Sequence, residues 1–266
     1  MTAAPLLPRD LDATLVLLRH GESAWIAEGR FQGQGDSPLS SLGRRQVELA
    51  ARRLATPHDA PALPVPSGPP LAIVHSPLSR TTETARAVAA AMADAGMAVP
   101  PPQPDPGFLE IGQGDWEGLP GATIVERWGP VLRGWREDPL TAWAPGGESL
   151  PEVDRRVQAS LRTLLGRLLA AAPPPDATRA HVLGYADGAG DEPWALLVGH
   201  DGVFKVALLA LLDLPLTRFW TFPFALCGIT VVELRRGRSR LRLHNAADHL
   251  APLEHAASNA RLSGAL

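Results

Sequence analysis

The sequence is poor in cysteine, in basic clusters and in long apolar runs. Cys227 is its single cysteine, so the chain cannot form an internal disulfide and nothing indicates a thiolate-bound metal cluster. Lysine and arginine number 25 against 28 aspartate and glutamate residues, which gives a net charge of −3. This balance, without any basic run, argues against a nucleic-acid partner.

Apolar runs of membrane-spanning length are also missing, and Met1–Asp12 lacks the basic segment and apolar core of a signal peptide. We therefore expect no membrane association and a cytoplasmic protein. With 266 residues, 45% of them hydrophobic, the chain is large enough for a sizeable core. We predict one domain over residues 14–250, an N-terminal extension of residues 1–13 and a C-terminal tail of residues 251–266.

Three short apolar runs each end in a cation or an imidazole. They are Leu15–Leu18 before Arg19 and His20, Leu71–Val74 before His75 and Arg80, and Ala195–Val198 before His200. Unbroken aliphatic runs are typical of strands buried on both faces of a parallel sheet. Because ligands bind at the carboxyl ends of such strands, we expect these groups to converge on one anion. Each histidine taken alone could equally be a structural hydrogen-bonding group.

Helical patterns alternate with these runs. We predict helices over Ser41–Ala55, Thr81–Ala95, Ala122–Asp138 with an interruption at Gly129-Pro130, a stretch opened by the capping box Ser149-Leu150-Pro151-Glu152, and Val203–Leu212. Ser76 is the predicted N-cap and Pro77 the first residue of the second helix, which places Arg80 in its first turn. A guanidinium at a helix N-terminus favours an anion, although a surface salt bridge is the alternative.

The other segments are expected to be connections or edge strands. Ala24–Leu39, Thr56–Pro70 and Val99–Gly107 are predicted as loops, and His181–Tyr185 as a short strand. Ile229–Leu234 and Arg240–His244 are predicted as a hairpin, whose apolar strands could pair across a homodimer.

Glu110 is the candidate proton donor. It lies between Leu109 and Ile111 in a glycine-rich segment, and partial burial would favour its protonated form near neutral pH. The alternative is a solvated acid in a loop. The glycines here do not form the G-x-G-x-x-G pattern, so a dinucleotide site is not indicated.

Several short motifs follow one another in a particular order. They are Arg19-His20-Gly21-Glu22-Ser23, Arg30-Phe31-Gln32-Gly33, Ser76-Pro77-Leu78-Ser79-Arg80-Thr81-Thr82-Glu83-Thr84-Ala85, Glu110 with Trp116-Glu117-Gly118, Pro145-Gly146-Gly147-Glu148-Ser149, Val198-Gly199-His200-Asp201-Gly202 and Asn245-Ala246-Ala247-Asp248-His249-Leu250. Together they resemble the histidine phosphatase superfamily, also called phosphoglycerate mutase-like, over about residues 14–250. The resemblance implies an α/β fold, a three-layer α/β/α sandwich on a mostly parallel central sheet.

The resemblance also implies a metal-independent mechanism without a cofactor, acting on a small phosphomonoester. Neutral His20 attacks phosphorus, while Glu110 protonates the leaving group and then activates water. The phosphoryl oxygens are held by Arg19, Arg80 and protonated His200, with substrate contacts from Gly21, Ser23, Arg30, Gln32 and Gly33. Slow phosphate monoester hydrolysis calls for such a covalent step and such charge stabilisation. The opposite protonation states of His20 and Glu110 predict a mildly acidic to neutral pH optimum.

Ile26 departs from the family pattern, which commonly has an asparagine at this position that contacts the phosphoryl group. Its absence places more weight on Arg30, on the Gln32-Gly33 backbone, or on Glu22 and Ser23.

Two other functions are considered beside a phosphatase. A phosphoglycerate mutase is less favoured, because Glu110 is followed by Ile111-Gly112-Gln113 and not by a run of the Glu-Arg-His-Tyr-Gly type. A non-catalytic phosphoryl-binding module is less favoured still, because every catalytic residue type is present. The leaving group is left open among α-ribazole phosphate, phosphoglycerates, sugar phosphates and nucleotides. The tryptophans of Ala122–Trp143 are expected either to pack against an apolar or sugar-like leaving group or to belong to the core.

Overall fold

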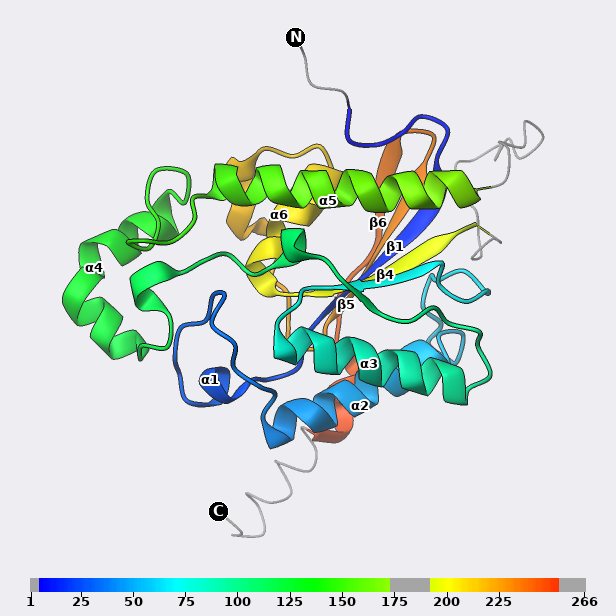
Figure 1. Cartoon of the computed structure of the whole chain (residues 1–266), viewed down its shortest axis with the longest axis horizontal. Coiled ribbons are helices and arrows are strands. Elements are labelled where there is room, and N and C mark those ends of the chain that lie inside the picture. The colour runs from blue at the N-terminus through cyan, green and yellow to red at the C-terminus, as the bar shows by residue number, and fades with distance from the viewer. Residues whose placement is uncertain (1–4, 173–191, 254–266) are drawn as a thin grey trace.

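The described part of the computed structural model comprises residues 5–172 and 192–253, which form a six-stranded sheet (Figure 1). The strands are β1 (Asp12–Arg19), β2 (Ala72–His75), β3 (Gln103–Pro104), β4 (Trp194–Gly199), β5 (Ile229–Arg235) and β6 (Arg238–Ala246). Their order is β3-β2-β4-β1-β5-β6, and β5 alone runs against the others. The predicted mostly parallel sheet is therefore confirmed.

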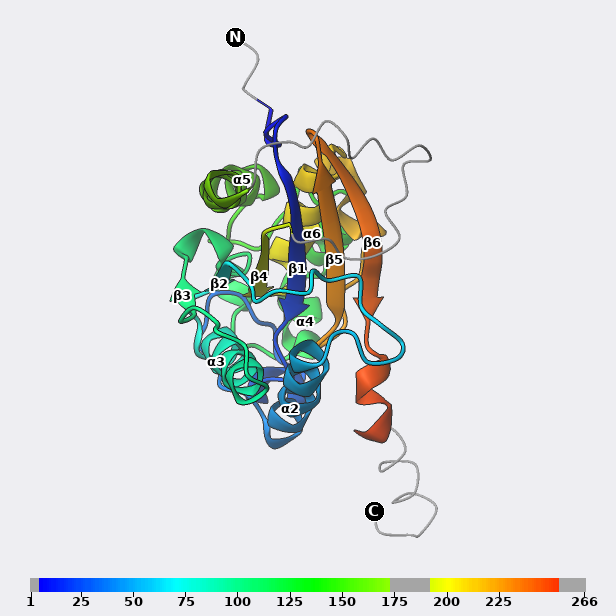
Figure 2. The ribbon, with the colours of Figure 1, turned by 90° about the vertical axis from the view of Figure 1, so that its right-hand side faces the viewer.

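Helices cover both faces of this sheet, as Figure 2 shows. They are α1 (Ala24–Ala27), α2 (Ser41–Ala55), α3 (Ser79–Asp94), α4 (Gly121–Glu137), α5 (Leu150–Ala171) and α6 (Asp201–Leu211), with short 3-10 helices η1 (Pro106–Phe108), η2 (Gly114–Trp116), η3 (Leu216–Thr221) and η4 (Asp248–Leu250). α2 and α3 lie on one face, and α5 and α6 lie on the other. The predicted three-layer sandwich is confirmed. Among the helices in the described ranges, none combines the length and the apolar composition needed to cross a membrane.

The apolar run of β1 serves both layers. Leu15 and Leu17 pack in the core beneath α5 and α6, whereas Val16 and Leu18 pack in the core beneath α2 and α3. All four side chains are fully buried. This two-sided burial explains why the run shows no polar alternation.

The start of α3 differs from the prediction. The helix begins at Ser79, with Leu78 in an extended conformation as its N-cap, and Ser76 does not cap it. A residue distant in sequence supplies the missing acceptor, because Asp36 Oδ1 accepts from Ser79 N at 2.7 Å. Arg80 still lies in the first turn, as predicted.

Other boundaries also shifted. The predicted loop Ala24–Leu39 contains α1, and the predicted connection Val99–Gly107 contains β3 and η1. The interruption in α4 falls at Trp128, just before the predicted Gly129-Pro130.

The hairpin turn between β5 and β6 is tighter than predicted. It consists of two residues, Arg236 and Gly237, both with positive φ, which suits a two-residue hairpin turn. β1 begins at Asp12, within the predicted extension, and Leu11 beside it is buried. The predicted strand His181–Tyr185 and most of the predicted tail lie outside the described residues.

Candidate active site

The two histidines at neighbouring strand ends lie side by side. Arg19 at the end of β1 is paired in register with Gly199 at the end of β4, and His20 N donates to Gly199 O at 3.0 Å. The ring centroids of His20 and His200 are 5.0 Å apart, with an edge-to-face angle of 64°. The parallel pairing of β1 and β4 thus brings two distant imidazoles together at one sheet edge, as predicted.

The ring of His20 is held in one tautomer. Its Nδ1 donates to Gly21 O at 2.6 Å, and because a carbonyl oxygen only accepts, the proton lies on Nδ1. Burial, followed by the positive charges of Arg80 and Arg19, lowers the pKa of His20 well below its usual value. His20 is therefore neutral near pH 7, and its Nε2 keeps a lone pair for nucleophilic attack.

His200 is buried without a hydrogen-bond partner. It stands at the N-cap of α6 with 0% exposure, and both of its ring nitrogens lack partners within the described residues. Burial, then Arg80 and His20, lower the pKa of His200 well below its usual value. The protonated form that the resemblance implies thus requires a nearby negative charge, which a phosphoryl group would supply.

Arg80 is a fully buried cation with donors to spare. Its Nη1 donates to Gly35 O at 2.9 Å and its Nη2 to Gly33 O at 2.8 Å, while its Nε has no partner in the described structure. Burial lowers the pKa of Arg80 to about 10, so it stays charged at neutral pH. Arg80 is 0% exposed and donates to backbone carbonyls, so the alternative of a surface salt bridge is wrong.

Arg19 completes the cationic group. Its Nη1 donates to Phe224 O at 2.5 Å, and its buried Nε has no hydrogen-bond partner among the described residues. A buried donor without a partner is costly, and such groups are retained where a ligand satisfies them. Two guanidiniums with free Nε donors beside two imidazoles form a site suited to an anion.

The carboxyl group of Glu110 lies at the N-terminus of α6. Its Oε1 accepts from Ile111 N and Val203 N, both at 2.9 Å, and its Oε2 accepts from Gly202 N at 3.1 Å. These bonds fix the carboxyl group at the N-terminus of α6, the helix that follows His200. Gly202 is required here, because an added Cβ would lie 2.8 Å from Glu110 Oε1.

A pocket of about 240 Å³ opens onto this group. Arg19, His20 and Glu110 line it, whereas Arg80 and His200 are fully buried and do not. Ile26 lines the pocket as well, so the position where the family commonly has an asparagine presents an apolar side chain to it.

The residues predicted to bind substrate fall into two groups. Arg30 and Gln32 line the pocket. Ser23 is fully buried, and its Oγ caps α1 and accepts from Gln32 Nε2. Gly21 packs against α2, where an added Cβ would lie 2.5 Å from Gly43 O, and Gly33 accepts from Arg80. These last three are placed to support the site from behind.

Arg156 on α5 is a positioning residue that the sequence did not reveal. It donates to Leu109 O at 2.7 Å and to Glu110 O at 3.0 Å, and it pairs with Glu148 at 2.8 Å. Glu148 in turn accepts from Gly112 N at 2.8 Å. These bonds hold the segment that carries Glu110. Glu148 belongs to a recognised motif, but Arg156 had no distinguishing pattern.

Four aromatic residues also line the pocket, namely Phe31, Trp135 on α4, and Phe219 and Trp220 on η3. Trp135 lies in the segment predicted to influence the leaving group, whereas Phe219 and Trp220 lie far from it in sequence. In residues 5–172 and 192–253, no group of three or more His, Cys, Asp or Glu side chains is arranged to hold a metal ion.

Comparison with known proteins agrees with this arrangement. Residues 15–170 and 179–247 match the model of the histidine phosphatase superfamily (branch 1). The chain is 28% identical to phosphoserine phosphatase 1 of Hydrogenobacter thermophilus, over 89% of this chain and 93% of that protein. It is 35% identical to glucosyl-3-phosphoglycerate phosphatase of Mycobacterium tuberculosis, over 77% and 78% of the two chains.

Among solved structures, mycobacterial hydrolase 1 superposes with a TM-score of 0.67 at 31% identity, covering 89% of this chain and 99% of that one. The family model spans the motifs from Arg19 to Asn245 that surround the pocket. The chain therefore belongs to branch 1 of the histidine phosphatase superfamily and is a phosphoric monoester hydrolase of that family.

Proposed function

We propose that the enzyme hydrolyses a small phosphomonoester through a phosphohistidine on His20. The observation that carries this proposal is the hydrogen bond from His20 Nδ1 to Gly21 O, which leaves Nε2 as the unprotonated nitrogen. In the first step Nε2 attacks phosphorus, and the bond from phosphorus to the ester oxygen breaks. Glu110 donates a proton to the departing alkoxide, so the leaving group departs as a neutral alcohol.

The second step reverses the role of Glu110. The carboxylate accepts a proton from water, whose oxygen attacks phosphorus while the bond from phosphorus to Nε2 breaks. Inorganic phosphate leaves, and His20 returns to its neutral form. Glu110 is protonated again and ready for the next turnover.

The buried cations act on the transferring phosphoryl group. The unpartnered Nε atoms of Arg19 and Arg80 supply donors for its oxygens, and His200 takes up a proton when the dianion lies beside it. The protein thereby provides positive charge at the reacting centre without a metal ion or a cofactor in this proposal.

The relatives support hydrolysis of small phosphorylated metabolites. They are named as phosphatases of phosphoserine and of glucosyl-3-phosphoglycerate, and both activities remove a phosphoryl group. A phosphoglycerate mutase would instead return the phosphoryl group to the substrate, and the segment after Glu110 lacks the run that the mutases carry.

The test is release of inorganic phosphate from a panel of phosphomonoesters with EDTA present, by wild type and by His20→Ala. We expect metal-independent release by wild type, none by the variant, and an acid-labile phosphorylated protein after rapid quenching. Interconversion of phosphoglycerates after priming by a bisphosphoglycerate would favour the mutase. Inactivity in both assays would favour the phosphoryl-binding module.

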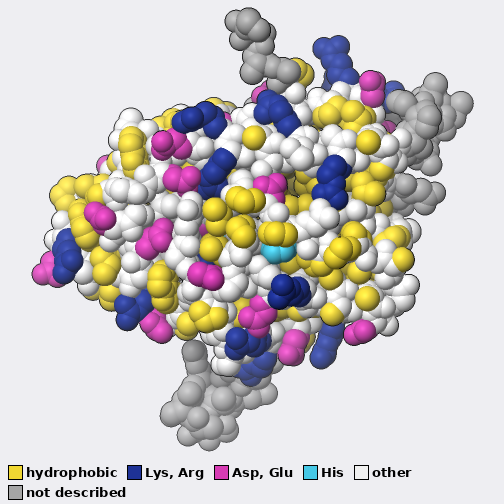
Figure 3. Space-filling model, in the orientation of Figure 1, with side chains coloured by type: hydrophobic (Ala, Val, Ile, Leu, Met, Phe, Trp, Pro, Cys, Tyr) yellow, Lys and Arg dark blue, Asp and Glu magenta, His cyan; other side chains and the backbone are white. Residues whose placement is uncertain are grey.

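We also propose a cytoplasmic protein whose partner is this metabolite. Figure 3 shows basic and acidic side chains interspersed over the drawn face, without a continuous basic surface there for a nucleic acid. A homodimer stays a prediction. β6 is an edge strand, but Val231 pairs with Leu243 and Val232 with Leu241, so a bulge at Arg242 opposes pairing between copies. Light scattering against the 28.2 kDa chain mass tests it.

A further inference from the structure

Aromatic rings form part of the wall of the pocket. Trp220 lies 5.6 Å from Trp135 and 4.7 Å from Phe219 between ring centroids, each pair at 76°. Such edge-to-face contacts fix the plane of a ring. Trp220 nevertheless stays 45% exposed while lining the pocket, which is unusual for a tryptophan held on two sides.

Lys205 holds Trp220 from a third side. Its Nζ lies 4.9 Å from the Trp220 ring centroid, in a cation–π arrangement, and 2.6 Å from Asp201 Oδ2. Lys205 is only 6% exposed, so it belongs to the support of the ring and not to the pocket surface. Trp220 therefore presents exposed surface to the pocket while Trp135, Phe219 and Lys205 hold its ring in place.

The cationic side chains near Trp220 have partners within the chain. Arg30 lines the pocket, but its Nε pairs with Glu28 Oε2 at 2.6 Å and its Nη1 donates to Gly118 O at 2.7 Å. Lys205 is paired with Asp201, which itself lines the pocket. Two nitrogens of Arg30 and the ammonium group of Lys205 are thus already engaged within the chain, which weakens their attraction for a carboxylate on the leaving group.

Polar groups that suit hydroxyls stand beside the rings. Gln32, Gln113 and Asp201 all line the pocket, and amides and carboxylates both bind hydroxyl groups. The volume of about 240 Å³ lies below the roughly 300–1,000 Å³ of pockets for drug-sized ligands. The space therefore suits a single ring better than a nucleotide or a disaccharide.

We propose that the leaving group is an uncharged, hydroxyl-bearing ring of monosaccharide size, which stacks its C–H face on Trp220 and turns its hydroxyls to the polar side chains. This inference rests on the proposed phosphatase activity and names its substrate class, a cyclic sugar phosphate. Such a substrate would differ from phosphoserine and glucosyl-3-phosphoglycerate, after which two relatives are named and which both carry a carboxylate.

The experiment compares three substrates that differ only in the leaving group. Glucose 6-phosphate has an uncharged ring, glycerol 3-phosphate is uncharged and open, and phosphoserine is charged. We expect wild type to show the highest kcat/KM for glucose 6-phosphate. Trp220→Ala should lower the ratio of kcat/KM for glucose 6-phosphate over glycerol 3-phosphate about tenfold, chiefly through KM, and Trp220→Phe should recover most of it.

Two further variants complete the test. Trp143→Ala removes an exposed tryptophan that does not line the pocket, and it should leave the ratio unchanged. Glu28→Gln breaks an exposed ion pair and frees Arg30, which should raise kcat/KM for phosphoserine relative to glucose 6-phosphate about two- to fivefold.

A wild-type preference for phosphoserine, or an equal loss for both uncharged substrates in Trp220→Ala, would overturn the inference and leave the phosphatase proposal intact. If wild type released phosphate from none of a wide panel of phosphomonoesters, the proposed function would fall, and this inference with it. The two failures are therefore distinguishable.

Discussion

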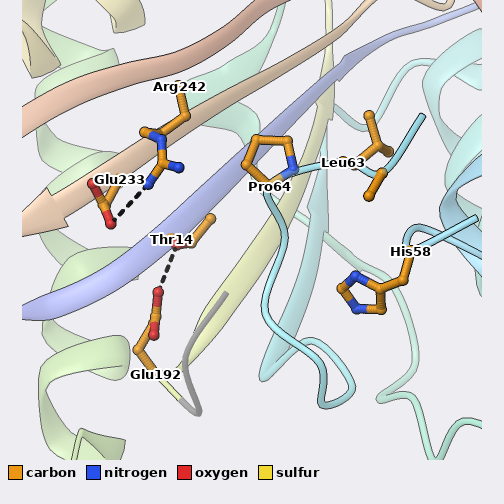
Figure 4. Close-up of a pocket in the computed structure, with 8 residues that line it drawn as sticks. Thr14, His58, Leu63, Pro64, Glu192, Glu233 and Arg242 are labelled. Carbon is orange, nitrogen blue, oxygen red and sulfur yellow. Dashed lines mark hydrogen bonds and ion pairs between the residues drawn. The ribbon is translucent and has the colours of Figure 1, made fainter. Parts of the chain in front are cut away.

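The two ends of β1 each carry a charged pocket of about 240 Å³, and they differ in how the charges are paired. At the end where β1 begins, Figure 4 shows Thr14, Glu192, Glu233 and Arg242 around the cavity. Glu233 pairs with Arg242 at 3.3 Å and with Arg235 at 3.0 Å, and Thr14 donates to Glu192 at 3.4 Å. Each carboxylate there has cationic or hydroxyl partners from the protein itself.

At the end where β1 stops, the cations are left with free donors. Arg19 Nε, Arg80 Nε and both ring nitrogens of His200 are buried without partners in the described structure. The two pockets therefore have equal volumes but differ in whether their charged groups have partners within the chain. Breaking a buried ion pair leaves an uncompensated charge, whereas the unpartnered donors around the phosphoryl site would be satisfied by a bound anion. The three variants or conditions below test this contrast.

The largest effect is expected for Arg80→Met. Removing a fully buried guanidinium from the phosphoryl site should lower kcat about 10²–10³-fold, as for other groups that stabilise transition-state charge. The free energy of unfolding without phosphate should fall by only about 1–2 kcal/mol, because the desolvation cost of the buried cation disappears while its hydrogen bonds to Gly33 O and Gly35 O are lost. Phosphate-release kinetics and urea denaturation measure both quantities. A large loss of stability together with activity would show that Arg80 serves the fold.

Glu233→Gln should give the reverse result. The carboxylate lies among three arginines, at 3.0, 3.3 and 3.8 Å, and its loss removes a negative charge that they share. Because those arginines are partly exposed, we expect a loss of only about 1–2 kcal/mol in the free energy of unfolding. kcat and KM should not change, since the pocket lies at the opposite end of the strand. A drop in kcat would break the contrast between the two ends.

The smallest effect concerns acid stability. The folded-state pKa values of His20 and His200 lie well below their usual value, chiefly through burial. At a pH between the folded-state pKa values and about 6.5, the unfolded chain binds more protons than the folded chain. The contribution of these histidines to the free energy of unfolding is therefore fully present above about pH 6.5 and is lost as the pH falls below it. His200→Gln should reduce this fall, measured as the change in melting temperature between pH 7 and pH 5. An unchanged slope in the variant would contradict the assignment of a neutral, buried His200.

Stabilisation by inorganic phosphate provides a control for the Arg80→Met and Glu233→Gln variants. It should stabilise wild type by mass action and should stabilise Arg80→Met much less. Glu233→Gln should respond to phosphate like wild type, because its charges lie away from the phosphoryl site.

Local sequence patterns predicted the elements that carry the catalytic residues. The aliphatic runs before Arg19 and His200 became β1 and β4, because strands buried on both faces leave no room for polar residues. The capping box at Ser149 opened α5 as predicted, because its hydrogen bonds are local. The predicted start of α3 was wrong, because the helix is capped by Asp36, which lies more than forty residues away in the sequence.

The sequence alone determined the layered α/β architecture, the family and the set of groups at the sheet edge, since periodicity and motif order depend on neighbours along the chain. Only the tertiary structure decided which charges are paired. It placed Arg156 behind Glu110, Lys205 beneath Trp220, and Ser23, Gly21 and Gly33 behind the pocket instead of in it. Burial and pairing depend on contacts between distant segments, and a single residue carries no local sign of the partner that it will meet.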